Sequence, residues 1–516
     1  MKLEMPKKPV CLTRKHYQDF FDWLINSNHV PLVSEEDPTL SDPNHSYREK
    51  ELIYYPENIY SLFSTQPFKR MDRILQTGTN IYSKDLSSLM HTRLQHSKGT
   101  YALKLDVLIR LFDNPSWRKL FSPPDKKKYL MAELLSSLLH DIGHGPFSHT
   151  FETIINAPKG NHEIIARRII LENEELRTSL ETILPELPML IVEVMEKDPL
   201  GLHFLDEGNI DIDRGDFIVR DVLQLSGISL KQMVDQIFTK ITYRYISDDG
   251  VHKKPVFQLE ALEDIKLFLN QRFENYKNVY YSKNSKRTEH IFETFGKTLA
   301  SSDSTTDLKY FLSNNIDKTP YEIDIDEFVK WDDVRYMKNI IKTVNHPPTE
   351  ELKSLAYLSI PNEESFYHMQ LGLLSKKEIP THTVSDRIHS LMKTRDQFCN
   401  QNCKVLNFKT SMQLEHTIKN IQNLLHLPDM VQDFGIIPYS DKIMVYDNKT
   451  PIYIEDENKK VYNFAKHPQV SQEDLREETL YGLLISIPSL KEKGISPNHL
   501  HKLDHFLLLR RTCRIK

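Results

Sequence analysis

The stretch HDIGHGPFSH, residues 140–149, gathers side chains that could bind a metal ion and transfer protons. It holds three of the chain's 22 histidines together with Asp141. Imidazole and carboxylate groups together bind Mn, Fe, Zn or Mg, and such a set does not choose among them. A bound divalent ion would activate water and neutralise an anionic substrate. The chemistry predicted for this stretch is therefore metal-assisted hydrolysis.

Three further stretches fit the same chemistry, and each is expected on a helix or at its end. They are HTRLQHSKGTYALKL, NHE and DIDRGDFIVRD, which supply His91, Arg93, His96, His162, Glu163, Asp211, Asp213, Arg214, Asp216, Arg220 and Asp221. Ligands from facing helices can converge on one ion inside a helical bundle. His140 and Asp141 are adjacent and do not share a helix face, so they would meet one ion at a helix end.

The histidines His144, His149 and His162 exceed what one metal ion needs, and the surplus favours proton transfer. Glu152 lies one helical turn after His149, where a carboxylate can orient the imidazole and favour its cationic, acid form. Taken alone, each fragment has another interpretation. A histidine on an apolar helix is usually structural, and the charges of residues 211–221 could be a solvated face or ordinary ion pairs. Their joint occurrence in otherwise apolar helices favours a site.

The elements that must position these residues are helices. The helical period dominates from about residue 51 to 300. In KKKYLMAELLSSLLHD, Leu130, Leu134 and Leu138 recur at i, i+4 spacing, which predicts a buried helix face. Residues 123–125, Pro-Pro-Asp, are typical of a helix start, and the Gly-x-Gly-Pro of residues 143–146 ends the helix.

Two more helices are expected to follow, with Ser148 and Asn161 as their caps. The second is the amphipathic stretch NHEIIARRIILENEEL, and residues 262–295 are expected to form one or two long helices. The N-terminal stretch KHYQDFFDWLI is also predicted to be helical.

The chain divides into three predicted regions. Residues 1–50 are a polar, proline-broken N-terminal extension, residues 51–345 are the helical catalytic region, and residues 346–516 are an accessory α+β region. Within the last, residues 442–468 alternate β-branched and aromatic runs with Asn/Asp/Lys turns, which predicts a small antiparallel meander. The fold class is therefore mainly α, a helical bundle with a smaller C-terminal α+β part.

Composition excludes several classes of protein. The net charge of −5 and a pI near 6.5 argue against a broad nucleic-acid surface. No P-loop or Rossmann glycine motif is present. The four cysteines fit a reducing compartment, and Cys399 with Cys403 could be a zinc pair or two ordinary thiols on a helix. Without a secretory signal or a run of 18 apolar residues, a soluble cytoplasmic protein with no membrane partner is expected.

The blocks resemble the HD-domain metal phosphohydrolases. Within that family they are most similar to the deoxynucleoside triphosphate (dNTP) triphosphohydrolases, the group that includes the vertebrate SAM-and-HD-domain enzyme. The similarity covers roughly residues 51–345, and no SAM domain is visible in residues 1–50. Five blocks carry it in one order: PFKRMDRILQTG, HTRLQHSKG, LLHDIGHGPFSHTFE, DIDRGDFIVRD and QRFENYKNVYYSK. The resemblance implies an HD-domain helical bundle as the catalytic core of residues 51–345.

The resemblance also implies a role for each matching position. The metal ligands would be His96, His140, Asp141 and Asp213. The catalytic group would be His144, His149, Glu152 and His162, with His149 as general acid. Arg93, Arg214, Arg272 and Lys283 would bind phosphates, Gln76 and Asp221 the sugar 3′-hydroxyl, and Tyr280 the sugar or base. Phe217, Tyr276 and Ser282 depart from the family pattern, which leaves the base preference open.

The implied activity is metal-dependent hydrolysis of dNTPs to deoxynucleoside and tripolyphosphate, by water attack at the α-phosphorus. One divalent ion, additional Mg²⁺ on the substrate phosphates, a homo-oligomer and a nucleotide activator are expected with it. Two alternatives stay open: an HD-type phosphodiesterase on a cyclic or other nucleotide phosphoester, and a nucleotide-binding regulator with a structural HD site. The four phosphate-binding cations favour a triphosphate, because a single phosphodiester needs fewer.

Overall fold

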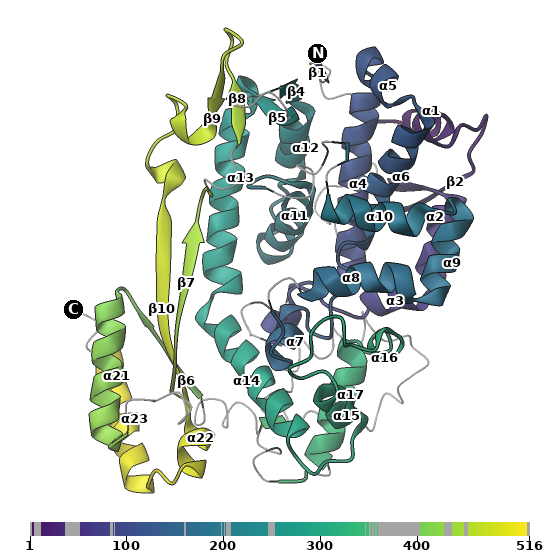
Figure 1. The fold of residues 1–516 in the computed structure, drawn as a ribbon. Coiled ribbons are helices and arrows are strands. Elements are labelled where there is room, and N and C mark those ends of the chain that lie inside the picture. The colour runs from purple at the N-terminus through teal and green to yellow at the C-terminus, as the bar shows by residue number, and fades with distance from the viewer. Residues whose placement is uncertain are drawn as a thin grey trace.

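The fold is mainly α-helical, with a smaller strand-containing C-terminal part, as the sequence predicts (Figure 1). The computed structural model describes residues 12–36, 52–82, 88–158, 161–197, 208–245, 253–345, 403–427, 436–447 and 452–512, with a few shorter pieces between them. Within these residues, no helix combines the length and the apolar character that crossing a membrane would require.

The first half of the chain is a helical bundle around the long helices α4 and α6. Its helices are α1 (Arg14–Ile25), α2 (Glu57–Tyr60), α3 (Gln66–Met71), α4 (Arg93–Phe112), α5 (Pro115–Phe121), α6 (Pro124–Leu139), α7 (His149–Ile154), α8 (Asn161–Glu172), α9 (Glu174–Ile183), α10 (Leu187–Glu196), α11 (Ile212–Ser226) and α12 (Lys231–Thr239). Leu130, Leu134 and Leu138 of α6 are fully buried, so the predicted buried face is confirmed.

The second half continues with a long helical segment. Helices α13 (Leu262–Asn275) and α14 (Lys283–Ala300) are joined by a π-helical turn at Tyr276–Tyr280. One or two long helices over residues 262–295 were expected, but the π-helical turn was not. Figure 1 shows these helices between the bundle and the C-terminal strands. Helices α15 (Asp307–Ser313), α16 (Ile325–Phe328) and α17 (Asp333–Asn345) follow.

In the part of the chain that the structure describes, three sheets accompany the helices. Strands β2 (Leu32–Glu36) and β3 (Leu52–Pro56) form an antiparallel pair. One five-stranded sheet has the order β1 (Leu3–Glu4), β4 (Ile241–Tyr245), β5 (Lys253–Gln258), β8 (Tyr453–Glu455) and β9 (Val461–Asn463). A three-stranded antiparallel sheet has the order β6 (Cys403–Phe408), β10 (Glu477–Ser486) and β7 (Ile436–Met444). Helices α21 (Ser411–Leu425), α22 (Ile487–Glu492) and α23 (Pro497–Thr512) accompany this last sheet.

The predicted meander over residues 442–468 is wrong. Strand β7 pairs with β10 in one sheet, whereas β8 and β9 pair with each other in the other sheet, where β8 lies parallel to β5. Hydrophobic alternation reports a strand but not its partner, and here both outside partners are distant in sequence.

The hydrophobic core does not follow the predicted region boundaries. Helix α1 buries Tyr17, Phe20 and Phe21 in the main cluster, so this part of the N-terminal extension belongs to the core. Val445 and Ile454 of the accessory region lie in the same cluster. A second, smaller cluster is formed between α21, α23 and the sheet of β6, β10 and β7.

Several local predictions can also be checked. Cys403 begins strand β6 and is not on a helix, whereas Cys399 lies outside the described residues. The predicted helix over 161–176 is two helices, because Asn173 caps a new one by accepting from the N–H of Leu176 at 3.1 Å. Asn161 is the first residue of α8, and its side-chain amide has no hydrogen-bond partner in the structure, so it is not a cap.

Candidate metal and catalytic site

Helix α4 presents His96 from its first turn. The helix begins where Thr92 accepts from the N–H of Gln95 at 3.2 Å and the Gln95 side chain accepts from the N–H of Thr92 at 2.8 Å, a reciprocal cap. Helix α6 ends at Leu139, and His140 is its C-terminal cap residue. Asp211 starts α11 by accepting from the N–H of Arg214 at 2.7 Å, which places Asp213 in the first turn. Three helix ends therefore meet at one place.

His96, His140 and Asp213 form a group that could hold a metal ion, with one ligand atom from each lying within 4.8 Å of the others. His96 Nε2 is 2.9 Å from Asp213 Oδ1, and His140 Nε2 is 3.6 Å from the same oxygen. Asp141 borders the group, with Oδ2 3.5 Å from His96 Nε2. These four residues, which we call the metal group, are the four predicted ligands.

The donor atoms of the metal group fit a divalent cation. His140 Nδ1 lies 2.9 Å from the carbonyl oxygen of Ser137 and can donate to it, which leaves Nε2 for a ligand. That Nε2 atom is buried and has no hydrogen-bond partner in the structure. A buried imidazole nitrogen facing two carboxylates is the arrangement expected of a ligand, because an unpaired buried polar atom is otherwise unfavourable.

The electrostatics of the metal group favour positive charge. Burial works against protonation of His96, but its hydrogen bonds with Asp213 and Asp216 outweigh burial and raise its pKa to about 9. Burial would raise the pKa of the Asp213 carboxyl, but His140 and His96 hold it well below its usual range. The carboxylates are thus anionic, and a cation between the imidazoles would be stabilised.

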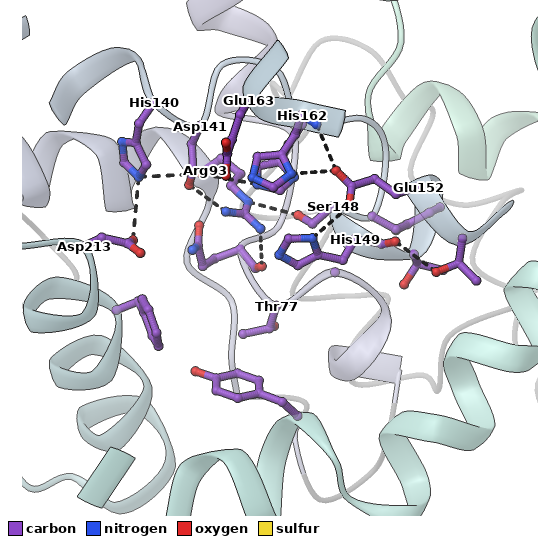
Figure 2. Close-up of a pocket in the computed structure, with 18 of the residues that line it drawn as sticks. Thr77, Arg93, His140, Asp141, Ser148, His149, Glu152, His162, Glu163 and Asp213 are labelled. Carbon is purple, nitrogen blue, oxygen red and sulfur yellow. Dashed lines mark hydrogen bonds and ion pairs between the residues drawn. The ribbon is translucent and has the colours of Figure 1, made fainter. Parts of the chain in front are cut away.

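A second group, which we call the histidine group, consists of His144, His149, Glu152 and His162. Its ligand atoms also lie within 4.8 Å of one another, so it too has the geometry to hold an ion. The rings of His144 and His162 stack with centroids 4.0 Å apart, and the His149 ring meets His144 edge-on at 4.9 Å. Figure 2 shows His149, Glu152 and His162 on one side of Arg93, and His140 and Asp213 on the other.

Glu152 binds two histidines. Its Oε2 lies 3.2 Å from His149 Nδ1, the contact expected from their spacing. Its Oε1 lies closer to His162 Nδ1, at 2.6 Å, and accepts from the backbone N–H of His162 at 3.0 Å. Burial would raise the pKa of Glu152, but the hydrogen bonds with His149 and His162 lower it well below its usual range. The anionic carboxylate therefore fixes both imidazoles.

The backbone around the histidine group is close-packed and strained. A Cβ atom on Gly143 would lie 2.0 Å from the carbonyl oxygen of His162, so only glycine allows this approach of the loop to α8. Phe147 and Ser148 both have positive φ, 58° and 56°, which costs about 1–2 kcal/mol per residue. Such strain gathers at functional sites where the surroundings hold it in place.

Arg93 lies between the two groups, and its guanidinium donates hydrogen bonds to other residues of the protein. It donates to Asp141 Oδ2 at 2.6 Å, to the Ser148 hydroxyl at 3.0 Å and to the Gln76 carbonyl at 3.2 Å. The Ser148 hydroxyl donates in turn to the carbonyl of Leu75 at 2.8 Å. Ser148 thus precedes α7, but its side chain makes no cap hydrogen bond, contrary to the prediction.

These residues surround a cavity of about 1020 Å³. Most predicted site residues line it: Gln76, Arg93, His140, Asp141, His144, His149, Glu152, His162, Asp213 and Tyr280. His96 lies fully buried behind Asp213. A cavity of this size has room for a nucleoside triphosphate.

The other predicted substrate residues do not line the cavity. Arg214 pairs with Asp211, and Asp221 lies buried behind Tyr280, whose hydroxyl donates to it. Burial raises the pKa of Asp221 to about 7. Arg272 donates to the carbonyl oxygens of Asn209 at 2.9 Å and Val445 at 3.0 Å. Lys283 is the first residue of α14.

The structure adds residues to which the sequence analysis assigned no role. Asp216 lies 2.8 Å from His96 Nδ1, and its position one turn after Asp213 could have indicated it. Buried Arg70 donates to the carbonyl oxygens of Ile142 at 3.1 Å and of His144, which fixes the loop after α6. No local sequence signal points to that contact.

The chain resembles known proteins over about half of its length. Residues 94–213 match the family model described as HD domain. The uncharacterized protein YwfO of Bacillus subtilis is 29% identical over 254 residues, which are 48% of this chain and 52% of that protein. The deoxynucleoside triphosphate triphosphohydrolase SAMHD1 homolog of Dictyostelium discoideum is 23% identical over 273 residues, 50% of each chain. The chain thus spans about half the length of these curated relatives.

A solved structure shares the fold. The phosphohydrolase from Bacteroides thetaiotaomicron superposes with a TM-score of 0.62 at 21% identity, covering 88% of this chain and 100% of that one. At this identity the likeness concerns the fold alone. Together, the family match over residues 94–213 and the metal group indicate an HD domain with a site that could hold a divalent ion.

Proposed function

We propose that this protein hydrolyses deoxynucleoside triphosphates to deoxynucleosides and tripolyphosphate. The observation that carries the proposal is the placement of the metal group and the histidine group on either side of Arg93, along one cavity of about 1020 Å³. One group can hold the ion that polarises a phosphate and activates water. The other can deliver a proton to the leaving oxygen. The name of the Dictyostelium relative supports the choice of substrate.

The proposed reaction divides the work between the two groups. Water attacks the α-phosphorus, the bond from phosphorus to the sugar 5′-oxygen breaks, and tripolyphosphate leaves. His149, 65% of whose side chain is exposed, protonates the 5′-oxygen, so that a neutral deoxynucleoside forms. Glu152 keeps the His149 ring oriented through Nδ1, which leaves Nε2 to donate. The Tyr280 ring on the cavity wall would contact the sugar or base.

A second candidate function is phosphodiester hydrolysis. Of the four cations that the resemblance assigns to the phosphates, Arg93 lines the cavity, whereas Arg214, Arg272 and Lys283 do not. A single phosphodiester needs fewer cations than a triphosphate, so the position of these three residues favours the phosphodiester. Arg167, Lys286 and Lys297 also line the cavity and would be the further cations that a triphosphate needs.

One assay separates the two candidates. The purified chain would be incubated with each dNTP, each NTP and a cyclic dinucleotide, with Mn²⁺, Fe²⁺, Zn²⁺ or Mg²⁺, and nucleoside, tripolyphosphate and nucleotide products would be resolved by chromatography. Deoxynucleoside and tripolyphosphate in equal amounts are expected. Cleavage of the cyclic dinucleotide with no tripolyphosphate from any dNTP would replace the first candidate with the second.

A further inference from the structure

His96 is held from the side opposite the metal group by Asp216. The Asp216 Oδ2 atom lies 2.8 Å from His96 Nδ1 and accepts from Arg220 Nε at 2.7 Å. All three side chains are buried, with His96 and Arg220 at 0% and Asp216 at 5% exposure. Asp216 and Arg220 are four residues apart on α11, whereas His96 is on α4, so this contact joins two helices of the bundle.

The space for Asp216 depends on one glycine. Gly99 lies three residues after His96, on the same face of α4. A Cβ atom built there would lie 1.9 Å from Asp216 Oδ1 and 2.1 Å from a terminal nitrogen of Arg220. Neither distance is compatible with a real contact. A glycine in the middle of a helix costs roughly 0.5–1 kcal/mol relative to alanine, and here it allows the approach.

We propose that Asp216, given room by Gly99 and paired with Arg220, is a positioning residue that sets His96 for metal binding. With Nδ1 donating to Asp216, the lone pair of Nε2 is left for the ion, and the ring cannot rotate away from Asp213. A carboxylate behind a metal-binding imidazole also makes the imidazole a stronger ligand. Asp216 itself does not line the cavity, so it acts through His96.

This inference concerns the metal group alone and is independent of the substrate. It is tested on the full-length chain without nucleotide, by stripping metal with a chelator and titrating with Co²⁺, whose visible absorption reports coordination. Asp216→Asn keeps the shape of the side chain but removes its charge and one acceptor. It should raise the Kd for Co²⁺ about 10–100-fold, the usual effect of losing such a residue.

Gly99→Ala tests the same contact without changing any charge. It should displace Asp216 and weaken Co²⁺ binding similarly. The double variant should lose little beyond Asp216→Asn alone, because both changes break one contact. The matched control is Ser97→Ala, next to His96 on α4. Ser97 is buried, and its hydroxyl has no hydrogen-bond partner among the residues that the structure describes. The Kd of Ser97→Ala for Co²⁺ should therefore stay within twofold of that of the unmodified chain.

Thermal unfolding of each metal-free variant shows that it is folded before titration. If folded Asp216→Asn binds Co²⁺ as tightly as Ser97→Ala does, Asp216 has only a structural role and the proposal is wrong. If Asp216→Asn weakens binding but folded Gly99→Ala does not, the effect is one of charge alone and the positioning role is also overturned. If the unmodified chain binds Co²⁺ but hydrolyses no dNTP, the proposed function is contradicted and the inference about Asp216 is not.

Discussion

Glu152 connects the general acid proposed for this site to a second histidine. Its two oxygens contact His149 Nδ1 at 3.2 Å and His162 Nδ1 at 2.6 Å, and His162 stacks on His144. The shorter contact and the additional bond from the His162 backbone make His162 the better-fixed ring. His149, which is exposed on the cavity wall, keeps more freedom. In the proposed reaction, this shared carboxylate would fix one imidazole near the phosphates and orient another toward the leaving group.

The role of His149 can be separated from that of Glu152. A positioned general acid contributes about 10²–10⁴-fold, so His149→Ala should lower dNTP turnover by that factor while metal content and dNTP binding persist. Glu152→Gln should lower turnover less, because it weakens the orientation and charge of the acid without removing it. It should also weaken dNTP binding, since His162 loses the same partner. Turnover and KM measured for both variants check this.

A substrate with a much better 5′-leaving group provides the control. Such a leaving group needs no proton, so His149→Ala should act on it at nearly the rate of the unmodified enzyme. An equal loss on both substrates would mean that His149 supports the site without serving as the acid.

The metal group has its own test. His140→Ala combined with Asp141→Ala removes two of its four members, so the ion and the activity should both be lost. Because His140 follows α6 at the helix end, far-ultraviolet circular dichroism should show the helical content unchanged. A stoichiometric metal content in the purified double variant would exclude these ligands.

At the scale of elements, one segment outside the HD-domain match holds the loops of the site. Asp333, at the start of α17, is fully buried and accepts from the N–H groups of Leu75 at 3.0 Å and Phe147 at 2.6 Å. The next residues in the chain, Gln76 and Ser148, both accept hydrogen bonds from Arg93. The carbonyl of Trp331 accepts from Arg70 at 2.7 Å. The α17 start therefore fixes the strained turn before His149.

Asp333→Ala should be strongly destabilising. It leaves two buried N–H groups without an acceptor, at about 1–3 kcal/mol each, so the free energy of unfolding should fall by about 2–5 kcal/mol. Asp332→Ala is the matched control. Asp332 binds Arg73 at 3.0 Å, where the Arg73 side chain is 33% exposed, and accepts from one backbone N–H, that of Arg335, at 2.8 Å. Its removal leaves one N–H without its acceptor where the removal of Asp333 leaves two, so the loss should be smaller. Urea unfolding of the two variants measures the difference, and equal losses would contradict this account.

Elements with a strong local period were predictable from the sequence, whereas distant contacts were not. The buried leucines of α6 and the helical character of residues 262–295 follow from helical spacing, and the start of α6 follows from its turn residues. The residue types predicted a metal site, and the family resemblance selected the four residues of the metal group. Other contacts join residues far apart in the chain, and no local pattern encodes them. Examples are the pairing of β7 with β10 and the hydrogen bonds that the Asp333 carboxylate accepts from the N–H groups of Leu75 and Phe147. The same reason explains why Arg272 was expected in the cavity and instead binds Asn209.

At the scale of the whole molecule, a partly buried polar contact attaches the C-terminal region to the bundle. Asn209 and Asp447 exchange two hydrogen bonds, from Asn209 Nδ2 to the Asp447 carbonyl at 2.8 Å and from the Asp447 N–H to Asn209 Oδ1 at 2.9 Å. Arg272 donates to the Asn209 carbonyl and to Val445. Asn209 is 1% exposed and precedes Asp213 by four residues, so the attachment lies beside the α11 end that carries a predicted metal ligand.

Asn209→Ala should therefore loosen the C-terminal region and not only reduce global stability. The substitution removes both hydrogen bonds between Asn209 and the partly buried Asp447 backbone, at about 0.5–1.5 kcal/mol each. Lys277→Ala is the control within the same interface: Lys277 pairs with Glu478 at 2.7 Å, but the two side chains are 36% and 42% exposed. A surface pair of this kind contributes about 0–1 kcal/mol.

Hydrogen exchange by mass spectrometry should show faster exchange over residues 436–447 in Asn209→Ala than in Lys277→Ala, with α4 and α6 unchanged in both. Because β7 is bound to β10 along nine residue pairs, the faster exchange should spread to residues 477–486. Exchange that rises evenly over all helices would mean that Asn209 serves the general stability of the bundle and does not attach one region to another.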